Sequence, residues 1–441
     1  MDAENAGQIR LDVHDLGWDG DGVGRAENGR VVMVTGALPG DHILARITHT
    51  PAKGPLRAEM EKVLVASHAR VAHPCKHFST GCPGSPLGCL DFDTALDWKR
   101  DHLIETLKRV GKVENPAVDH VVPSPRSWRY RDRLEMNIVQ DEWGLHIGYR
   151  GREGQLIPIH DCLLGGVALR KTLTSLRESM PGVGRMEDLA GGDALRLLLR
   201  SNGKGGVIVV IFLVGKRRPD IAPLKRWLES ADCSGWQIRQ VPSVNSRYFN
   251  SEVVAEDGDI MVTHRVSGGY LKASPIVFSQ ANEAATYRLV HHVLDEVPRD
   301  AKMIDLYGGF GMFALAHIAH GGKSAAVFES SPEAVQAGKD YAEQHSLPAT
   351  YQVVDLDKAG EWAIDPEGVV VLDPARSGAS EIVIKKINSS GAKRVIYVSC
   401  HPAALARDVV RLTAYRPVKF KPLDMFPGTP DLETVAIFER I

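Results

Sequence analysis

The stretch "MIDLYGGFGMFALAHIA", residues 303–319, decides the fold class of this 441-residue chain. A short apolar segment ends in an acidic residue and a glycine-rich turn, and helix-forming residues follow. Glycines let the backbone approach a ligand closely, and the amino end of a helix favours polar or anionic groups. The glycine spacing does not fit the G-x-G-x-x-G pattern of dinucleotide-binding turns. The stretch therefore predicts a strand, a ligand-binding turn and a helix.

Apolar and helical stretches alternate from this point to the end of the chain. Further strands are expected within 324–330, 350–356, 368–375, 394–400, 415–426 and 433–441. This alternation indicates βαβ units and a mainly parallel sheet that ends in antiparallel strands. We expect residues 272–441 to form this α/β domain, with ligands bound at the carboxyl ends of the strands.

Acidic residues follow the expected strands. Glu329 ends the second strand, about twenty residues after the glycine turn, where an acid would hold ribose hydroxyls. Asp355 closes the third strand and could contact an adenine edge. Either residue alone could be an ordinary turn residue. As an ordered set they resemble the Rossmann-like S-adenosylmethionine-dependent methyltransferase fold rather than a dehydrogenase, which makes S-adenosylmethionine the expected cofactor.

Three reactive side chains are expected at the same edge. Cys400 ends one strand, Asp373 follows another in "VVVLDPARSG" (369–378), and Glu433 precedes the last strand. Carbon 5 of a pyrimidine becomes nucleophilic once a thiolate adds at carbon 6, and a base later removes the hydrogen at carbon 5. Such chemistry needs a thiol and a carboxylate together. A cysteine can also be a small packing residue, but its carboxylate neighbours favour catalysis.

Five segments in this order resemble the RNA uracil-5-methyltransferases, especially the iron–sulfur branch that methylates 23S ribosomal RNA. They are "FSQAN" (278–282), "DLYGGFG" (305–311), "LDPARSG" (372–378), "YVSCHP" (397–402) and "DMFPGTPDLE" (424–433). The resemblance, which spans nearly the whole chain, implies that Cys400 is the nucleophile and Glu433 the proton acceptor. It also implies that four residues bind the methyl donor, namely Gln280, Tyr307, Glu329 and Asp373. Asp355 is a looser match to a donor-binding position.

The sequence departs from the family pattern near this edge. Met312 stands where relatives often have Asn, and Ala375 replaces the second proline of D-P-P-R. His401 replaces an Asn after the cysteine, and Asp431 replaces a His two residues before the glutamate. These departures concern the fine positioning of the site and leave the assignment of thiol and base unchanged.

The first 68 residues predict a separate β-barrel. Short β-like runs alternate with glycine-rich turns, which is typical of a small all-β barrel. The segment "GVGR…GRVVMVTGALPGDHILARI" (22–47) resembles a TRAM domain, an oligonucleotide-binding (OB) fold found on RNA-modifying enzymes. We expect residues 1–68 to bind RNA; a barrel that merely packs against its neighbour is the alternative.

Residues 69–271 are expected to form a central α+β domain that carries a cysteine-ligated cluster. Cys75, Cys82 and Cys89 are equally spaced, and Cys162 stands alone in "IPIHDCLL" (157–164). Four thiolates suit zinc or a 4Fe–4S cluster, and spacing does not choose between them, although the C-x₂-C pairs of structural zinc sites are absent. The family resemblance implies a 4Fe–4S cluster at these four positions, with insertions between the first three.

The segment "RSWRYRDRLEMNI" (126–138) interleaves arginines with aromatic residues. On a strand, alternate arginines would share one face and grip phosphates while the aromatic rings stack on bases. A solvated strand face is the alternative. The resemblance of "YRDR" (130–133) to the family implies RNA contact, mainly by Arg131. The target uridine would be flipped into the pocket.

Composition limits the remaining possibilities. The net charge of −2 means that an RNA site must be a local patch. No signal peptide and no run of about 18 apolar residues is seen, so we expect a cytoplasmic protein without a membrane span or an obligate protein partner. The expected substrate is a uridine of 23S ribosomal RNA. The alternatives are the same chemistry on the T-loop of transfer RNA, or a non-catalytic RNA-binding iron–sulfur protein.

Overall fold

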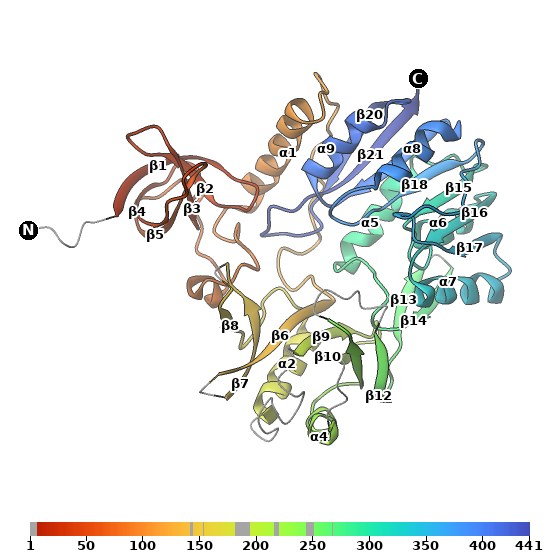
Figure 1. Ribbon diagram of the computed structural model, residues 1–441, viewed down its shortest axis with the longest axis horizontal. Helices are drawn as coiled ribbons and strands as arrows, with labels where there is room; N and C mark the ends of the chain where they lie inside the picture. Colours follow the sequence, from red (N-terminus) through yellow and green to blue (C-terminus); the bar gives the residue numbers. More distant parts are fainter. Residues whose placement is uncertain are drawn as a thin grey trace, which may run out of the picture. The chain divides into compact units, whose positions relative to one another are not determined.

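A computed structural model describes residues 7–141, 144–152, 154–180, 195–215, 220–243, 251–266 and 268–441 (Figure 1). The chain divides into two compact units. The first comprises the chain up to Asp101 together with Phe426–Asp431, and the second comprises His102–Met425 together with Leu432–Ile441. The expected division of the chain at residues 68 and 271 stays a prediction.

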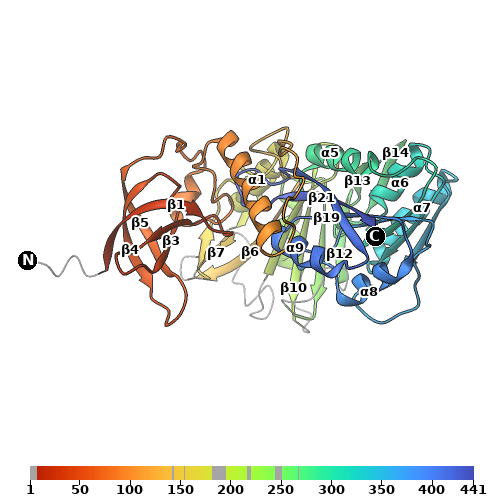
Figure 2. The same ribbon diagram turned by 90° about the horizontal axis from the view of Figure 1, so that it is seen from above.

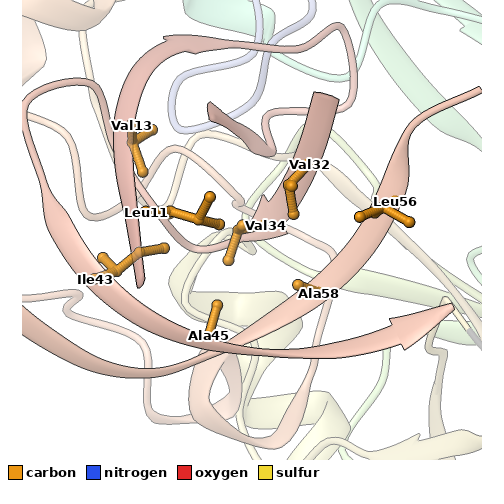
Figure 3. Packing of buried hydrophobic residues seen from close by; sticks show 9 residues of the cluster. Leu11, Val13, Val32, Val34, Ile43, Ala45, Leu56 and Ala58 are labelled. Carbon is orange, nitrogen blue, oxygen red and sulfur yellow. The ribbon is translucent and has the colours of Figure 1, made fainter. Parts of the chain in front are cut away.

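The first unit contains a closed five-stranded barrel with strand order β1-β2-β3-β5-β4. Its strands are β1 (Gln8–Leu16), β2 (Gly22–Arg25), β3 (Val31–Thr35), β4 (His42–His49) and β5 (Leu56–Val65). Alternate side chains of these strands point inward, so Val32 and Val34 of β3 are fully buried beside Leu11 and Ile43 (Figure 3). The predicted OB-like barrel is therefore confirmed. A short helix η1 (Lys76–Thr80) and the start of α1 (Phe92–Arg109) follow the barrel.

The second unit begins with a mixed seven-stranded sheet of order β12-β11-β10-β9-β6-β7-β8. Its strands are β6 (Arg133–Asp141), β7 (Gly144–Arg150), β8 (Leu156–Pro158), β9 (Leu195–Ser201), β10 (Val207–Val214), β11 (Gly235–Val241) and β12 (Glu252–Gly258). The helices α2 (Val167–Ser179) and α4 (Ala222–Glu229) accompany it. Every residue of β10 is buried, because this apolar strand lies in the middle of the sheet. A separate hairpin follows, formed by β13 (Val262–Val266) and β14 (Gly269–Ala273).

A second seven-stranded sheet, of order β17-β16-β15-β18-β19-β21-β20, forms the carboxyl-terminal part of this unit. Its strands are β15 (Lys302–Leu306), β16 (Ser324–Glu329), β17 (Ala349–Val353), β18 (Val369–Leu372), β19 (Arg394–Ser399), β20 (Tyr415–Leu423) and β21 (Glu433–Arg440). The first five in this order are parallel, and β21 pairs antiparallel with both β19 and β20. The predicted parallel sheet with antiparallel final strands is thus confirmed.

Helices cover both faces of this carboxyl-terminal sheet. They are α5 (Glu283–Leu294), α6 (Met312–Ala319), α7 (Pro332–Gln344), α8 (Glu381–Ser390) and α9 (Pro402–Arg411). Figure 2 shows α5 and α6 on one side of the sheet and α8 and α9 on the other. The strand order reverses between β15 and β18, because β16 and β17 lie on the far side of β15. Ligands of such sheets bind at this reversal, outside the carboxyl ends of the strands.

Across the parts of the chain that the structure describes, no helix combines the length and the apolar character needed to cross a membrane.

Candidate active site

Three of the predicted donor-binding residues end adjacent strands at the same level of the sheet. Leu306 of β15 pairs with Phe328 of β16 on one side and with Leu372 of β18 on the other. The next residue of each strand is Tyr307, Glu329 or Asp373. The backbone N–H of Asp373 also donates to the Leu306 carbonyl at 3.3 Å. The sheet therefore brings these three residues to one edge, at the reversal of strand order.

The turn after β15 has left-handed backbone conformations that glycine adopts readily. Gly309 (φ 58°) and Gly311 (φ 85°) lie in the left-handed region, and a Cβ on Gly311 would lie 2.6 Å from the hydroxyl oxygen of Tyr351. The Gly309 N–H donates to Glu329 Oε2 at 3.1 Å. The other carboxylate oxygen of Glu329 accepts from the backbone N–H of Ser331 at 2.7 Å. Glu329 is thereby fixed between the turn and the start of α7.

Asp305 supports the turn from beneath, a role that sequence reasoning did not assign. Its carboxylate is fully buried, and Oδ2 accepts from the backbone N–H of Ala314 in α6 at 3.3 Å. Burial raises the pKa of Asp305 to about 8, and the charges of Asp373 and Glu329 add to this effect. A Cβ on Gly308 would lie 2.8 Å from the Asp305 carboxyl carbon, so only glycine fits there. The sequence signal that could have indicated this role is the position of an acidic residue just ahead of a glycine turn.

Gln280 contacts Asp373 directly, which joins two of the predicted donor-binding residues. Its side-chain amide donates to Asp373 Oδ2 at 3.1 Å. Burial raises the pKa of Asp373 to about 7, although the bond from Gln280 opposes that rise. The loop before Gln280 is held by the buried guanidinium of Arg200, which donates to the Pro275 carbonyl at 2.6 Å and to Ser279 Oγ at 2.7 Å. This arrangement places an amide and a carboxyl group side by side at the sheet edge.

Tyr307 and Asp355 have polar partners in the loop after β17. The Tyr307 hydroxyl donates to Asp357 Oδ1 at 2.8 Å, and Tyr307 itself has a left-handed backbone (φ 59°). Asp355 lies two residues beyond Val353, the last residue of β17, and forms an ion pair with Lys358 at 3.0 Å. Asp357 was not predicted, because an exposed acid in a loop gives no signal in a single sequence.

The predicted nucleophile and base meet where β19 and β21 run side by side. Ser399 pairs with Thr434 in this antiparallel ladder. Continued by one residue, the same register sets Cys400 opposite Glu433. Directly opposed residues of an antiparallel pair have Cβ atoms about 4.5–5.5 Å apart, on the same face. Glu433 is fully buried and Cys400 is partly exposed. By this register the partly exposed thiol and the buried carboxyl group belong to neighbouring positions at one edge of the sheet.

His401 keeps the capping role that an Asn would have. Its Nδ1 accepts from the backbone N–H of Ala404 at 3.3 Å, and Pro402 occupies the first turn of α9. Asn is a preferred residue at this capping position because its side-chain oxygen accepts the same kind of bond. The departure from the family pattern at His401 therefore leaves the start of α9 intact. Met312 begins α6 directly after the glycine turn, and Ala375 is exposed.

A buried carboxylate joins α9 to the loop that follows Asp373. Asp408 Oδ2 accepts from the Tyr397 hydroxyl at 2.8 Å and from the backbone N–H of Ala379 at 2.9 Å. Asp408 Oδ1 accepts from Arg411 at 2.8 Å. Helix α9 starts two residues after Cys400, so this cluster couples the segments that carry the thiol and Asp373. Sequence reasoning missed it, since contacts between distant segments leave no local pattern.

The four predicted cluster cysteines divide between the two units. Cys75 precedes η1, Cys82 follows it, and Cys89 is buried, all in the first unit. Cys162 is buried in the second unit, with its sulfur 3.8 Å from the hydroxyl oxygen of Tyr149. No group of three or more His, Cys, Asp or Glu side chains in the described ranges is arranged to hold a metal ion. No chemical step is assigned to a cluster.

The interpretation that all arginines of this segment alternate on a strand fails ahead of Arg133. Strand β6 begins only at Arg133, and Arg129 has a left-handed backbone (φ 58°), which breaks the alternation that a strand requires. Tyr130 is buried, so its ring is not available for stacking on a base. Arg131 forms an isolated bridge with Gly165, and its Nε is buried without a hydrogen-bond partner among the described residues. RNA contact by Arg131 stays a prediction.

The fold and the strand-edge site define an S-adenosylmethionine-dependent methyltransferase with an amino-terminal barrel. The family model of the TRAM domain matches residues 7–60. The 23S rRNA (uracil(1939)-C(5))-methyltransferase RlmD of Halomonas elongata is 30% identical, over 99% of this chain and 91% of that one. An uncharacterized RNA methyltransferase of Listeria innocua is 29% identical over 97% of both chains.

A solved structure extends this likeness to the fold. The tRNA (uracil-54, C5)-methyltransferase of Pyrococcus abyssi, in complex with S-adenosyl-L-homocysteine, superposes with a TM-score of 0.75 at 25% identity, covering 98% of this chain and 100% of that one. The chain belongs to the RNA uracil-5-methyltransferase family.

Proposed function

We propose that this protein methylates carbon 5 of a specific uridine in RNA, with 23S ribosomal RNA as the favoured substrate. The observation that supports the proposal is the antiparallel register of β19 and β21, which opposes Ser399 and Thr434, the chain neighbours of Cys400 and Glu433. Asp373 ends β18, the strand next to β19, and contacts Gln280. A thiol, a base and a polar donor-binding pair therefore share one edge.

The residues of this edge have distinct roles in the proposed reaction. The Cys400 thiolate forms a bond to carbon 6 of the uracil, which makes carbon 5 nucleophilic. S-adenosylmethionine, when bound, supplies an electrophilic methyl group that carbon 5 takes up. Glu433 then accepts the proton from carbon 5, and the bond between Cys400 and carbon 6 breaks to release the thiolate.

The methyl donor would lie over the row of strand ends. We assign Glu329 to the ribose hydroxyls, Asp355 to the adenine edge, and Gln280, Tyr307 and Asp373 to the remainder of the donor. The Gly309 N–H that holds Glu329 supports this assignment, because it orients the carboxylate at the glycine turn. A sulfonium cation near Asp373 would favour the ionised carboxylate.

The choice of RNA rests on the relatives. The Halomonas elongata relative is named for uridine 1939 of 23S ribosomal RNA. The Pyrococcus abyssi structure, named for uridine 54 of transfer RNA, matches this chain over its whole length and makes transfer RNA the second candidate. The TRAM barrel and Arg131 are proposed to contact the RNA, and such an enzyme would act in the cytoplasm without an obligate protein partner.

The proposed 4Fe–4S cluster on Cys75, Cys82, Cys89 and Cys162 rests on the family resemblance alone. Iron and acid-labile sulfide analysis of anaerobically purified protein tests it. About four iron atoms per chain are expected for one such cluster, whereas a preparation that contains only zinc would overturn this part.

A covalent adduct tests the main proposal. Incubation with RNA that contains 5-fluorouridine and with S-adenosylmethionine should yield a stable protein–RNA adduct, because fluorine at carbon 5 cannot leave as a proton. Cys400→Ala should abolish the adduct. Cys233→Ala is the matched control, because Cys233 lies ahead of β11 in the other sheet and should leave the adduct unchanged. An adduct that persists in Cys400→Ala would remove Cys400 as the nucleophile.

Glu433→Gln separates the two catalytic roles. The variant should form the methylated adduct on ordinary uridine RNA and release it slowly, because only the removal of the proton is impaired. A protein that binds RNA but forms no adduct in its wild-type form would favour the non-catalytic alternative.

A further inference from the structure

A pocket of about 640 Å³ lies beside the proposed active site and shares only Gln280 with the residues assigned to the reaction above. It is lined by the β13–β14 hairpin and by α5 and α6. Gln280 and Phe310 belong to its wall, whereas Tyr307, Glu329, Asp373 and Cys400 do not. Because Gln280 also bonds to Asp373, the pocket adjoins the strand-end row without being part of it.

Three buried polar atoms in the pocket wall lack hydrogen-bond partners among the described residues. They are Asp132 Oδ1, Thr263 Oγ1 and His264 Nε2. A buried polar atom without a partner is destabilising, so native proteins rarely retain several in one place. Three in a single cavity indicate that a ligand with its own donors and acceptors completes them.

The shape and charge of the inner end define the class of that ligand. The His264 ring stacks on Phe310 with a centroid separation of 4.9 Å, so two aromatic rings belong to the wall. Burial and the nearby charge of Arg200 lower the pKa of His264 to about 3, so the imidazole is neutral and offers one donor and one acceptor. Thr263 can donate or accept. A planar ring edged with both donors and acceptors, as in a nucleobase, fits this end.

The exposed residues of the wall are suited to a nucleic-acid chain rather than to an isolated base. Tyr287, which is 65% exposed, stands edge-on to His291 at 4.4 Å, and His320 follows at 5.9 Å. Arg265 is exposed in the same wall. Aromatic faces stack on bases, and arginine holds phosphates. The volume is within the usual range of about 300–1,000 Å³ for a ligand pocket.

We propose that this pocket binds a nucleobase of the RNA substrate other than the target uridine, and so contributes to substrate selection. The proposal rests on the proposed function, because it takes the RNA substrate as the ligand. Its position next to Gln280 means that a neighbouring nucleotide would enter this pocket while the target uridine reaches Cys400.

Thr263→Val tests the proposal with little risk to folding. Valine has nearly the same shape, suits a β-strand and removes only a hydroxyl that lacks a partner. The probe is a fluorescein-labelled synthetic 23S rRNA stem-loop around uridine 1939, the position in the name of the Halomonas elongata relative. Fluorescence anisotropy should give about tenfold weaker RNA binding, the effect of one lost buried hydrogen bond. Binding of S-adenosyl-L-homocysteine should be unchanged.

Abasic substitutions in the RNA identify the base. One abasic position outside the target should weaken binding by the wild-type protein, and the same substitution should add little in Thr263→Val, since both remove one contact. Thr350→Val, on the exposed part of β17, is the control and should leave RNA affinity unchanged. Unchanged RNA affinity of Thr263→Val, or additive effects at every abasic position, would overturn the proposal.

The outcomes separate this proposal from the proposed function. Weaker RNA binding by Thr263→Val in a protein that forms no covalent adduct would retain the pocket and refute the enzyme. Normal adduct formation, together with unaltered RNA affinity of Thr263→Val, would support the enzyme and refute the pocket as an RNA site. A change confined to S-adenosyl-L-homocysteine binding would assign the pocket to the methyl donor and refute it as an RNA site.

Discussion

We predict that Tyr397→Phe loosens the loop after Asp373 while the sheet stays folded. The Tyr397 hydroxyl donates to Asp408 Oδ2 at 2.8 Å and accepts from the Ala379 N–H at 3.0 Å. The same Asp408 oxygen accepts from Ala379 at 2.9 Å. Phenylalanine keeps the buried ring, so the variant leaves the Ala379 amide with one acceptor instead of two and leaves Asp408 with one donor fewer.

The size of the effect follows from these contacts. A hydrogen bond to a charged group contributes about 1.5–3 kcal/mol, and about 1.4 kcal/mol corresponds to a tenfold change in an equilibrium constant. The local opening that exposes the Ala379 amide should therefore become roughly ten- to a hundredfold more frequent. Because this loop follows Asp373, the rate of adduct formation on 5-fluorouridine RNA should fall as well.

Hydrogen–deuterium exchange measured on a peptide that contains Ala379 checks this prediction without assuming two-state unfolding of the whole chain. Tyr415→Phe is the matched control, because its hydroxyl is also buried but donates to the carbonyls of Ile387 and Ala392. It should leave exchange at Ala379 unchanged. If Tyr397→Phe leaves exchange at Ala379 unaltered, or if both variants accelerate it equally, the reasoning from the Asp408 cluster is refuted.

Three further predictions concern titration and capping. Because burial raises the pKa of Asp305 to about 8, the folded protein retains a proton that the unfolded chain has lost, and stability should fall as pH rises from about 4 toward 8. Asp305→Asn should flatten that decline in thermal unfolding midpoints; a parallel decline in both proteins would contradict this. The pKa of Asp373, raised to about 7, predicts that S-adenosylmethionine binds more tightly at pH 8 than at pH 6, because the ionised carboxylate attracts its sulfonium. Calorimetry should show a weaker pH dependence for the neutral S-adenosylhomocysteine, and equal dependences would argue against the contact. His401→Ala should lose about 1 kcal/mol of stability by removing the helix cap, whereas His401→Asn should restore it. If neither variant differs from the wild type in its midpoint of urea unfolding, the capping role of His401 is contradicted.

The carboxyl-terminal sheet could be predicted from the sequence because its determinants are local. Short apolar runs alternate with helical stretches, and each functional residue directly follows a strand. Since parallel strands end at one edge, Tyr307, Glu329 and Asp373 had to converge. The register that sets Cys400 against Glu433 was not visible in the sequence, although the antiparallel ending of the sheet was.

The arginine-rich segment shows where such reasoning fails. Alternating arginine and aromatic residues have the period of a strand, but a left-handed residue at Arg129 interrupts the extended chain. Nothing in the residue types marks that break, because arginine rarely adopts this conformation. Asp408 and the pocket at His264 were missed for another reason, since each depends on segments that are distant in sequence.

The opposed directions of β19 and β21 have a consequence for how such an enzyme can diversify. The spacing between sulfur and carboxylate depends on ladder pairing and not on the length of the connection that leads from β20 into β21. The connection itself is anchored, because the Asn282 amide donates to the Met425 carbonyl at 3.0 Å, so variation for different RNAs is expected in other loops. A shift of β21 by one residue, in contrast, would turn Glu433 to the opposite face of the sheet and remove the proposed proton acceptor from the site.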